Sequence, residues 1–323
     1  MKKTHLFIYS FIFSLPLWWG MNVFGIGMDN YFMDREIVKN PYILKAQISS
    51  FVSLPKAPGK LEIGAKSAVS VLIKPNGEKE VIFSKNADER LAIASLTKLM
   101  SAYVVLNNLD LSKVITVSSD SIVNKGEHNG LSAGQTFKAK DLLYASMIES
   151  SNDGITALTQ PFGKSPFINL MNMEAEYMGL NNTEFFNPSG LDPDSRNEGA
   201  NYSTAADLAI LAEKMFQNPI ASEMLSLKEF DLYDIHGAFN HKSMTTNNIL
   251  LYPAELKGLQ IIGGKTGETP FASGCLLLVA KNSRNGMFIN VILGSGNRFG
   301  EMEELANWSN SLADYKRILA LFN

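Results

Sequence analysis

The sequence predicts a mixed α/β (α+β) fold, in which one antiparallel sheet is built from both ends of the domain and a helical subdomain is inserted between them. Strand-like segments joined by turn signals occur twice, once near each end of the domain, at residues 68–73 with 80–84 and at 272–281 with 287–293. Pro75-Asn76-Gly77 separates the first pair, which is a hairpin signal. Between the two pairs, apolar residues recur at helical spacing. The second hairpin should therefore continue the sheet that the first one begins.

The middle of the chain is predicted to be largely helical. Helical spacing of apolar residues is present in five segments, namely 97–107, 139–148, 152–160, 166–178 and 205–216. Ser203 or Thr204 is suited to cap the last of these, because a side-chain oxygen there can accept from free backbone N–H groups. A final helix is predicted at 301–321, where the apolar residues keep the spacing of one helix face. That face should pack on the sheet.

Composition indicates a globular protein. With 323 residues and 46% hydrophobic content, the chain can form the core of one large or two modest domains. The net charge is −3 and the basic residues are scattered, which argues against nucleic acid as a partner. Cys275 is the only cysteine, and its apolar neighbours predict a buried thiol. The four histidines are predicted to be ordinary loop residues, so we expect no metal site and no cofactor; they are His5, His128, His236 and His241.

Residues 1–28 predict a signal peptide or an N-terminal membrane anchor. Lys2 and Lys3 precede an uncharged run at 6–28, which is long enough to span a bilayer core of about 30 Å. Cleavage after Gly25 or Gly27 and retention as an anchor both stay open. Either way the chain is exported and acts outside the cytoplasm, and it contacts the membrane through this segment if the segment is not removed. Residues 29–60 contain several prolines and are predicted to be a linker.

Three short motifs occur in order along the chain: Ser95-Leu96-Thr97-Lys98, Ser150-Ser151-Asn152 and Lys265-Thr266-Gly267. None is specific alone. Ser53-Leu54-Pro55-Lys56 repeats the spacing of the first motif, in a Pro-rich stretch that disfavours a helix. The order of the three motifs and their flanks carry the signal, including Gly263-Gly264 directly before the third.

The first motif suits a serine nucleophile activated by a lysine. A serine hydroxyl needs a base within hydrogen-bond reach, and residues three apart share one face of a helix. Ser95 and Lys98 therefore point into one cleft if the helix starts near Ser95. Lysine acts as a base only when neutral, so Lys98 needs a lowered pKa, which burial and a nearby cation both favour. Lys265 is the obvious second cation.

This trio resembles the signature of penicillin-binding proteins and class A β-lactamases. The flanks are similar to those of the low-molecular-mass penicillin-binding proteins, the D-alanyl-D-alanine carboxypeptidases, in three segments: 138–154 (KAKDLLYASMIESSNDG), 186–191 (FNPSGL) and 202–207 (YSTAAD). The resemblance runs from about residue 68 to about residue 307 and implies a β-lactamase/transpeptidase-like fold, with the active site at the seam between sheet and helices. Class A β-lactamases carry a Glu-x-x-Leu-Asn segment between the second and third motifs, and this chain has none. Glu184-Phe185-Phe186-Asn187 is nearest, with the wrong spacing.

The resemblance implies a role for each motif residue. In the catalytic group, Ser95 is the nucleophile, Lys98 its base, Ser150 a proton relay to the leaving amine, and Asn152 a holder of the substrate amide or of Lys98. In the substrate-binding group, Lys265 supplies positive potential, Thr266 and Arg298 bind the substrate carboxylate, and Gly267 admits the substrate backbone. The backbone N–H groups of Ser95 and Glu268 would form the oxyanion hole, with the Glu268 side chain pointing away. The alternative for Arg298 is a surface ion pair with Glu301 or Glu303.

The resemblance implies that residues 61–323 form a serine D,D-peptidase domain. We expect a D-alanyl-D-alanine carboxypeptidase that trims peptidoglycan stem peptides through an acyl-enzyme on Ser95, with β-lactam antibiotics as covalent inhibitors. Three alternatives stay open: a D,D-endopeptidase that cleaves cross-links, a β-lactamase, and a non-catalytic penicillin-binding sensor. The hairpin and helix use up the residues after Gly267, where many family members add a β-rich domain, and this keeps the endopeptidase alternative open.

Overall fold

The protein is described by a computed structural model at residues 56–122, 130–193, 199–251, 256, 258–284 and 286–320. The predicted leader at 1–28 and residues 29–55 of the linker predicted at 29–60 lie outside these residues, so both stay predictions, as does the domain boundary at residue 61. The chain divides into two compact units, Ala57–Arg317 and a second unit made of Met1–Lys56 with Ile318–Asn323. The sheet and the site lie in the first unit.

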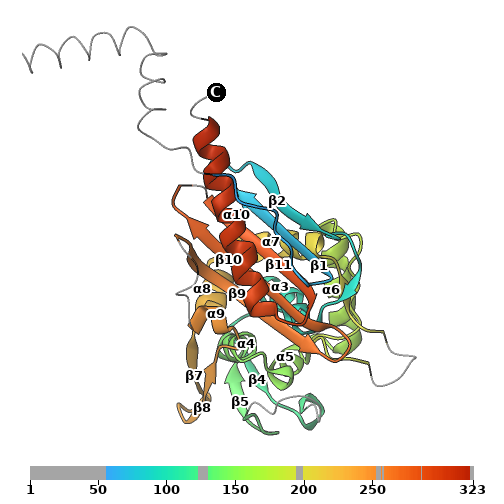
Figure 1. The fold of residues 1–323 in the computed structure, drawn as a ribbon. Helices are drawn as coiled ribbons and strands as arrows, with labels where there is room; N and C mark the ends of the chain where they lie inside the picture. The colour runs from blue at the N-terminus through green and yellow to red at the C-terminus, as the bar shows by residue number, and fades with distance from the viewer. Residues whose placement is uncertain are drawn as a thin grey trace, which may run out of the picture. The chain divides into compact units, whose positions relative to one another are not determined.

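A five-stranded antiparallel sheet forms the centre of this unit, with strand order β2-β1-β11-β10-β9 (Figure 1). Its strands are β1 (Ser67–Ile73), β2 (Lys79–Lys85), β9 (Gln260–Thr269), β10 (Ser273–Asn282) and β11 (Gly286–Ser295). β1 pairs with β11, so the N-terminal hairpin joins the C-terminal strands in one sheet. This confirms the predicted fold class and the predicted origin of the sheet.

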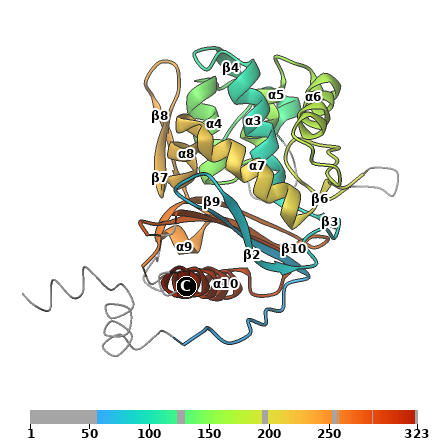
Figure 2. The same ribbon diagram turned by 90° about the horizontal axis from the view of Figure 1, so that it is seen from above.

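Helices cover both faces of the sheet, as Figure 2 shows from above. One face carries the inserted helical elements, which are η1 (Ala94–Thr97), α3 (Lys98–Asn108), α4 (Ala139–Ile148), α5 (Asn152–Thr159), α6 (Lys164–Tyr177), α7 (Ala205–Gln217) and α8 (Pro219–Ser226). The other face carries α10 (Arg298–Ala320). Thr204 caps α7 by accepting from the backbone N–H of Asp207, as its position predicted.

The pleat of β10 sorts its side chains between the two covers. Leu277 and Val279 belong to the large core shared with the inserted helices, whereas Leu276 and Leu278 pack with Met302 and its neighbours on α10. Each such leucine, fully buried, stabilises the fold by about 1.5–3 kcal/mol relative to an exposed one. The continuous apolar run of this strand follows from burial on both faces, and α10 packs on the sheet as predicted.

Several short elements complete the unit. They are β3 (Leu91–Ala92), β4 (Val114–Thr116), η2 (Ser119–Ser121), β5 (Thr136–Lys138), β6 (Tyr202–Ser203), β7 (Glu229–Tyr233), β8 (Phe239–Met244) and α9 (Asn248–Leu251). β7 and β8 form a hairpin that the sequence pattern did not predict. Within the described ranges, no helix combines the length and the apolar character needed to cross a bilayer.

Candidate active site

Ser95 and Lys98 come together at the start of α3. Ser95 lies in the 3₁₀ turn η1, and α3 begins at Lys98, one residue after the predicted start of the helix at 97. The side chains of Ser95 and Lys98 still point in the same direction, because residues three apart are eclipsed in a 3₁₀ turn. Lys98 Nζ lies 2.9 Å from Ser95 Oγ. Ala94, just before the serine, has a φ of +46°, an uncommon conformation that turns the chain sharply into the motif.

The Lys98 amine is fully buried and has three hydrogen-bond partners. Besides Ser95 Oγ it contacts Asn152 Oδ1 at 2.8 Å and the carbonyl oxygen of Ser189 at 2.8 Å. Burial, and then the positive charge of Lys265, hold the pKa of the Lys98 ammonium well below its ordinary value. A neutral amine at this distance can take the proton of the Ser95 hydroxyl. Asn152 is thus in contact with Lys98, as one of its two expected roles required.

The second motif lies between α4 and α5. Ser150 has a φ of +65°, and Ser151 then caps α5 by accepting from the backbone N–H of Gly154 at 3.1 Å. The sharp reversal at Ser150 aims its hydroxyl towards the third motif. Ser150 Oγ accepts a hydrogen bond from Lys265 Nζ at 2.8 Å. Ser95 and Ser150 are therefore each paired with a motif lysine.

The third motif lies on β9, the last strand in the order of the sheet. Lys265 is buried, and burial followed by the charge of Arg298 lowers its pKa to about 7. The hydroxyls of Thr266 and Thr246 share a hydrogen bond. A Cβ on Gly267 would lie 3.0 Å from the Ser95 backbone nitrogen and 3.1 Å from the Ile93 carbonyl oxygen, which is tighter than ordinary contact. Glycine at this position therefore lets β9 lie close to Ser95.

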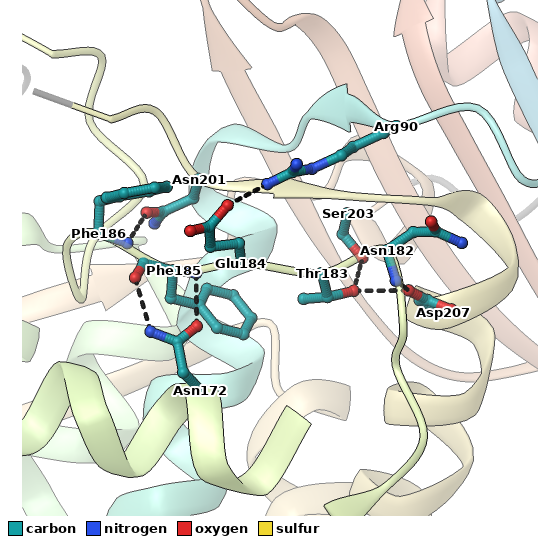
Figure 3. Close-up of polar contacts among 10 residues, drawn as sticks. All are labelled: Arg90, Asn172, Asn182, Thr183, Glu184, Phe185, Phe186, Asn201, Ser203 and Asp207. Atoms are coloured by element: carbon teal, nitrogen blue, oxygen red, sulfur yellow. Dashed lines mark hydrogen bonds and ion pairs between the residues drawn. The ribbon is translucent and has the colours of Figure 1, made fainter. Parts of the chain in front are cut away.

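A loop at 186–191 supplies the Ser189 carbonyl that contacts Lys98. Asn201 fixes this loop, because its Oδ1 accepts from the Phe186 N–H at 2.7 Å and its Nδ2 donates to Thr97 Oγ1 at 2.9 Å. Figure 3 shows the Asn201 contact with Phe186 beside further ties from Asn172 to Phe185. The loop is thereby held against the turn that carries Ser95. A residue outside the three motifs thus helps to place Lys98.

The motif residues surround one cavity of about 500 Å³. Seven of the nine predicted site residues line it, and Lys98 and Lys265 lie behind them, joined through their hydrogen bonds. The lining residues are Ser95, Glu149, Ser150, Asn152, Gly190, Leu191, Thr246, Thr266, Gly267, Glu268, Thr269, Arg298 and Phe299. All three motifs therefore meet at one place, on the side of the sheet that faces the inserted helices.

The expected direction of the Glu268 side chain is wrong. It does not point away from the site but forms an ion pair with Arg298 at the rim of the cavity. Glu301, one of the two alternative partners considered for Arg298, accepts hydrogen bonds from the backbone of Gly64 and Ala65. The ion pair forms because Glu268 near the end of β9 and Arg298 at the start of α10 reach the same rim.

His241 also differs from its prediction as a loop residue. It lies on β8, half-buried, with Nε2 2.8 Å from Glu149 Oε2 next to Ser150. His236, in contrast, is exposed in the turn of the hairpin. The unpredicted hairpin brings His241 to the end of α4, so no local signal in the sequence indicated the contact. Across the described ranges, no group of histidine, cysteine or carboxylate side chains has the arrangement of a metal site.

Glu184, the nearest match to a β-lactamase glutamate, lies elsewhere. It is exposed and pairs with Arg90 on the surface (Figure 3), and it is not among the residues that line the cavity. A glutamate in this position cannot activate a water molecule beside Ser95. This observation weighs against the β-lactamase alternative.

Comparison with known proteins decides the family. A family model described as D-alanyl-D-alanine carboxypeptidase matches residues 54–297. The chain belongs to the D-alanyl-D-alanine carboxypeptidase family. It is a low-molecular-mass penicillin-binding protein and a serine-type peptidase. The predicted family is therefore confirmed.

Relatives in the family carry two kinds of name. The chain is 29% identical to a D-alanyl-D-alanine endopeptidase of Pseudomonas aeruginosa, over 79% of this chain and 80% of that protein. It is 32% identical to the D-alanyl-D-alanine carboxypeptidase DacF of Bacillus subtilis, over 74% of this chain but only 60% of that protein. The crystal structure of a DD-transpeptidase of Streptomyces superposes with a TM-score of 0.70 at 27% identity, covering 79% of this chain and all of that one. The β-lactamase/transpeptidase-like fold is thus confirmed.

Lys265→Gln is expected to move the acid limb of the pH profile of Ser95 acylation towards higher pH. The charge of Lys265 is one cause of the lowered pKa of Lys98, so its loss raises that pKa and leaves Lys98 protonated over a wider range. The measurement is the second-order rate of Ser95 acylation by penicillin between about pH 5 and pH 9, a range that lies below the pKa of an unperturbed lysine. Lys265→Arg keeps the charge and should not shift the limb upwards. If the acid limb of the pH profile did not move in Lys265→Gln, the charge of Lys265 would not be a cause of the lowered pKa of Lys98.

Proposed function

We propose that this protein is a serine D-alanyl-D-alanine carboxypeptidase that trims peptidoglycan stem peptides through an acyl-enzyme on Ser95. The observation that carries the proposal is the contact of 2.9 Å between Ser95 Oγ and the buried Lys98 amine, whose pKa is lowered by burial. A hydroxyl beside a neutral amine is an activated nucleophile. The two motif pairs, Ser95 with Lys98 and Ser150 with Lys265, supply one base and one acid at the same cavity.

In the acylation step, Ser95 Oγ adds to the carbonyl carbon of the penultimate D-alanine while its proton passes to Lys98 Nζ. The negative charge on the carbonyl oxygen is stabilised by the backbone N–H groups of Ser95 and Glu268. The bond to the terminal D-alanine nitrogen then breaks, and this nitrogen takes a proton from the Ser150 hydroxyl. Lys265, which donates to Ser150, resupplies that proton.

In the deacylation step, a water molecule adds to the acyl carbon and gives its proton back through Ser150 to Lys265. The bond to Ser95 Oγ breaks, and Lys98 returns the proton that it took. Both lysines therefore end in their starting protonation states. A pKa near 7 for Lys265 suits a group that gives and takes a proton at neutral pH.

The substrate would bind as an extended peptide along β9. β9 has a strand partner on one side only among the described strands, so an extended peptide can pair with its other edge. Asn152 would hold a substrate amide, and Thr266 with Arg298 would hold the terminal carboxylate. A β-lactam presents an amide and a carboxylate in a similar arrangement and would acylate Ser95 without rapid release.

The compartment is inferred from the substrate. Peptidoglycan lies outside the cytoplasmic membrane, and the uncharged run at 6–28 is suited to direct export. We infer that the protein acts outside the cytoplasm and that the same segment attaches it to the membrane if it is retained. A protein found intact at the membrane after fractionation would support the anchor, and a shortened N-terminus would support cleavage.

A second candidate is a D,D-endopeptidase that cleaves peptide cross-links. Two observations favour it: the relative named an endopeptidase is matched over 80% of its length, and Glu268 pairs with the arginine that would select a free terminal carboxylate. The bond broken is again the one after a D-alanine carbonyl, so Ser95 and Lys98 would play the same roles. The two candidates differ only in the leaving group, which is a free D-alanine in one case and the amine of a neighbouring stem peptide in the other.

Two incubations test the proposal. A fluorescent penicillin should form a persistent adduct that peptide mapping assigns to Ser95 and that is absent from Ser95→Ala. The protein should then release D-alanine from an N-acylated L-Lys-D-Ala-D-Ala peptide faster than it splits purified cross-linked muropeptides. The reverse order of rates would make it an endopeptidase. Released penicilloate would indicate a β-lactamase, and an adduct with neither hydrolysis would indicate a sensor.

A further inference from the structure

Glu268 and Arg298 form an ion pair at the rim of the cavity, and the two partners differ in exposure. The Arg298 side chain is 19% exposed, whereas that of Glu268 is 63% exposed. The ring of Phe299 lies 4.8 Å from the guanidinium carbon of Arg298, and a Cβ on Gly274 would be 3.3 Å from Arg298 Cβ. The arginine is thus packed in place, while the glutamate can turn into solvent without losing buried contacts.

From this arrangement we infer that Glu268 is a specificity-determining residue: its carboxylate occupies the anion-binding position on Arg298 in the free enzyme and lowers the selectivity for substrates with a free terminal carboxylate. The inference rests on the proposed function, which assigns the terminal carboxylate to Arg298. Glu268 carries the same charged group as the end of a stem peptide. The Glu268 carboxylate therefore competes with the substrate carboxylate for Arg298.

The competition has two physical parts. A substrate carboxylate must displace Glu268 from Arg298, because the planar guanidinium cannot offer its best donor pair to two carboxylates at once. A displaced Glu268 still adds negative charge beside the incoming carboxylate, which opposes its binding. A substrate whose terminus is amidated or continued by further peptide meets neither obstacle. Glu268 thus reduces the difference in cleavage rate between a D-alanyl bond next to a free terminal carboxylate and one that is followed by further peptide.

The position of Glu268 in the chain makes this role separable from catalysis. Its backbone N–H belongs to the proposed oxyanion hole, whereas only its side chain reaches Arg298. A change to glutamine removes the charge and retains the backbone. Glu184 offers a matched control, because it is also an exposed glutamate paired with an arginine, Arg90, and it lies outside the cavity lining.

The test compares Glu268→Gln, Glu184→Gln and the wild type on one D-alanyl-D-alanine peptide in two forms, with a free acid and with an amidated terminus. Exposed ion pairs contribute little, so we expect Glu268→Gln to raise the ratio of kcat/KM for acid over amide by about fivefold, mainly through a lower KM for the acid. Glu184→Gln should leave the ratio at the wild-type value. A ratio in Glu268→Gln that equals that of the control would overturn the inference.

A second arm isolates the partner. Arg298→Ala should lower kcat/KM on the free acid by about 10- to 150-fold, as expected for loss of a charge-assisted hydrogen bond. In this background Glu268→Gln should no longer raise the ratio through competition, so its effect should shrink towards that of charge repulsion alone. A full fivefold effect without Arg298 would show that displacement is not involved.

Failure of the proposed function gives a different result. If a penicillin adduct does not form on Ser95, or no D-alanyl bond is cleaved, the proposed chemistry is wrong whatever the ratio. If the adduct forms and the peptide is cleaved, but Glu268→Gln leaves the acid-to-amide ratio of kcat/KM unchanged, only the inference about specificity fails.

Discussion

Lys98→Arg is expected to reduce the rate of Ser95 acylation by about 10²–10⁴-fold, the usual contribution of a general base. Arginine keeps its proton at any pH the protein tolerates, so it can offer charge but cannot accept the proton of Ser95. The Lys98 amine has the opposite properties, since burial and Lys265 both favour its neutral form. The measurement is the second-order rate of adduct formation with a fluorescent penicillin, followed by gel or stopped flow.

Lys98→Ala is the companion variant, because it removes the amine without adding a buried charge. Both variants should be nearly equally slow, and both should keep the thermal transition of a folded protein. An arginine variant that kept most of the wild-type rate would make Lys98 an electrostatic group, and another base for Ser95 would have to be found.

Gly190→Ala is expected to lower the free energy of unfolding by about 2–5 kcal/mol, from left-handed strain added to overpacking. Gly190 has a φ of +84°, and an added Cβ would lie 1.9 Å from the carbonyl oxygen of Ala94 and 2.8 Å from Thr97 Oγ1. Neither neighbour can move freely, because both belong to the turn that carries Ser95. The loop would have to withdraw and take the Ser189 carbonyl away from Lys98.

Gly179→Ala is the matched control for this variant. Gly179 has a similar φ of +75°, but no atom lies within 4 Å of the Cβ position, so its cost should be about 1–2 kcal/mol of backbone strain alone. Urea unfolding of the three proteins gives the difference. If the two variants lost equal stability, the contact of the loop with Ala94 would contribute nothing, and acylation in Gly190→Ala should then be normal.

The fold was predictable because its pattern is local. The turn between the strands of each pair is evident in the sequence. The helix predicted at 139–148 from apolar spacing has the same bounds as α4. The hairpin of β7 and β8 was not predicted, because only β7 alternates polar and apolar residues, over five residues, whereas β8 is mostly polar and has no such alternation. Strands of this kind are set by the surface they cover and not by their own pattern.

The site divides in the same way. The motif residues were identified through their resemblance to a known family signature, and the structure brings them together at one cavity. The Ser189 carbonyl, Thr246 and the glutamate partner of Arg298 were missed or misplaced, because each depends on a contact between segments far apart in the chain. A backbone carbonyl has no residue type to recognise, so no sequence pattern could have assigned Ser189 to Lys98.

Cys275 has a consequence for the redox behaviour of the protein. It pairs with Gly267 in the register of β10 and β9, is fully buried, and has a pKa raised to about 11 by that burial. Oxidation and thiol–disulfide exchange require a thiolate, which is scarce at such a pKa and unreachable in the core. Because it is the only cysteine in the chain, the folded protein should withstand an oxidising compartment without any disulfide. A cysteine introduced at an exposed position would then be the single thiol to react with a maleimide dye.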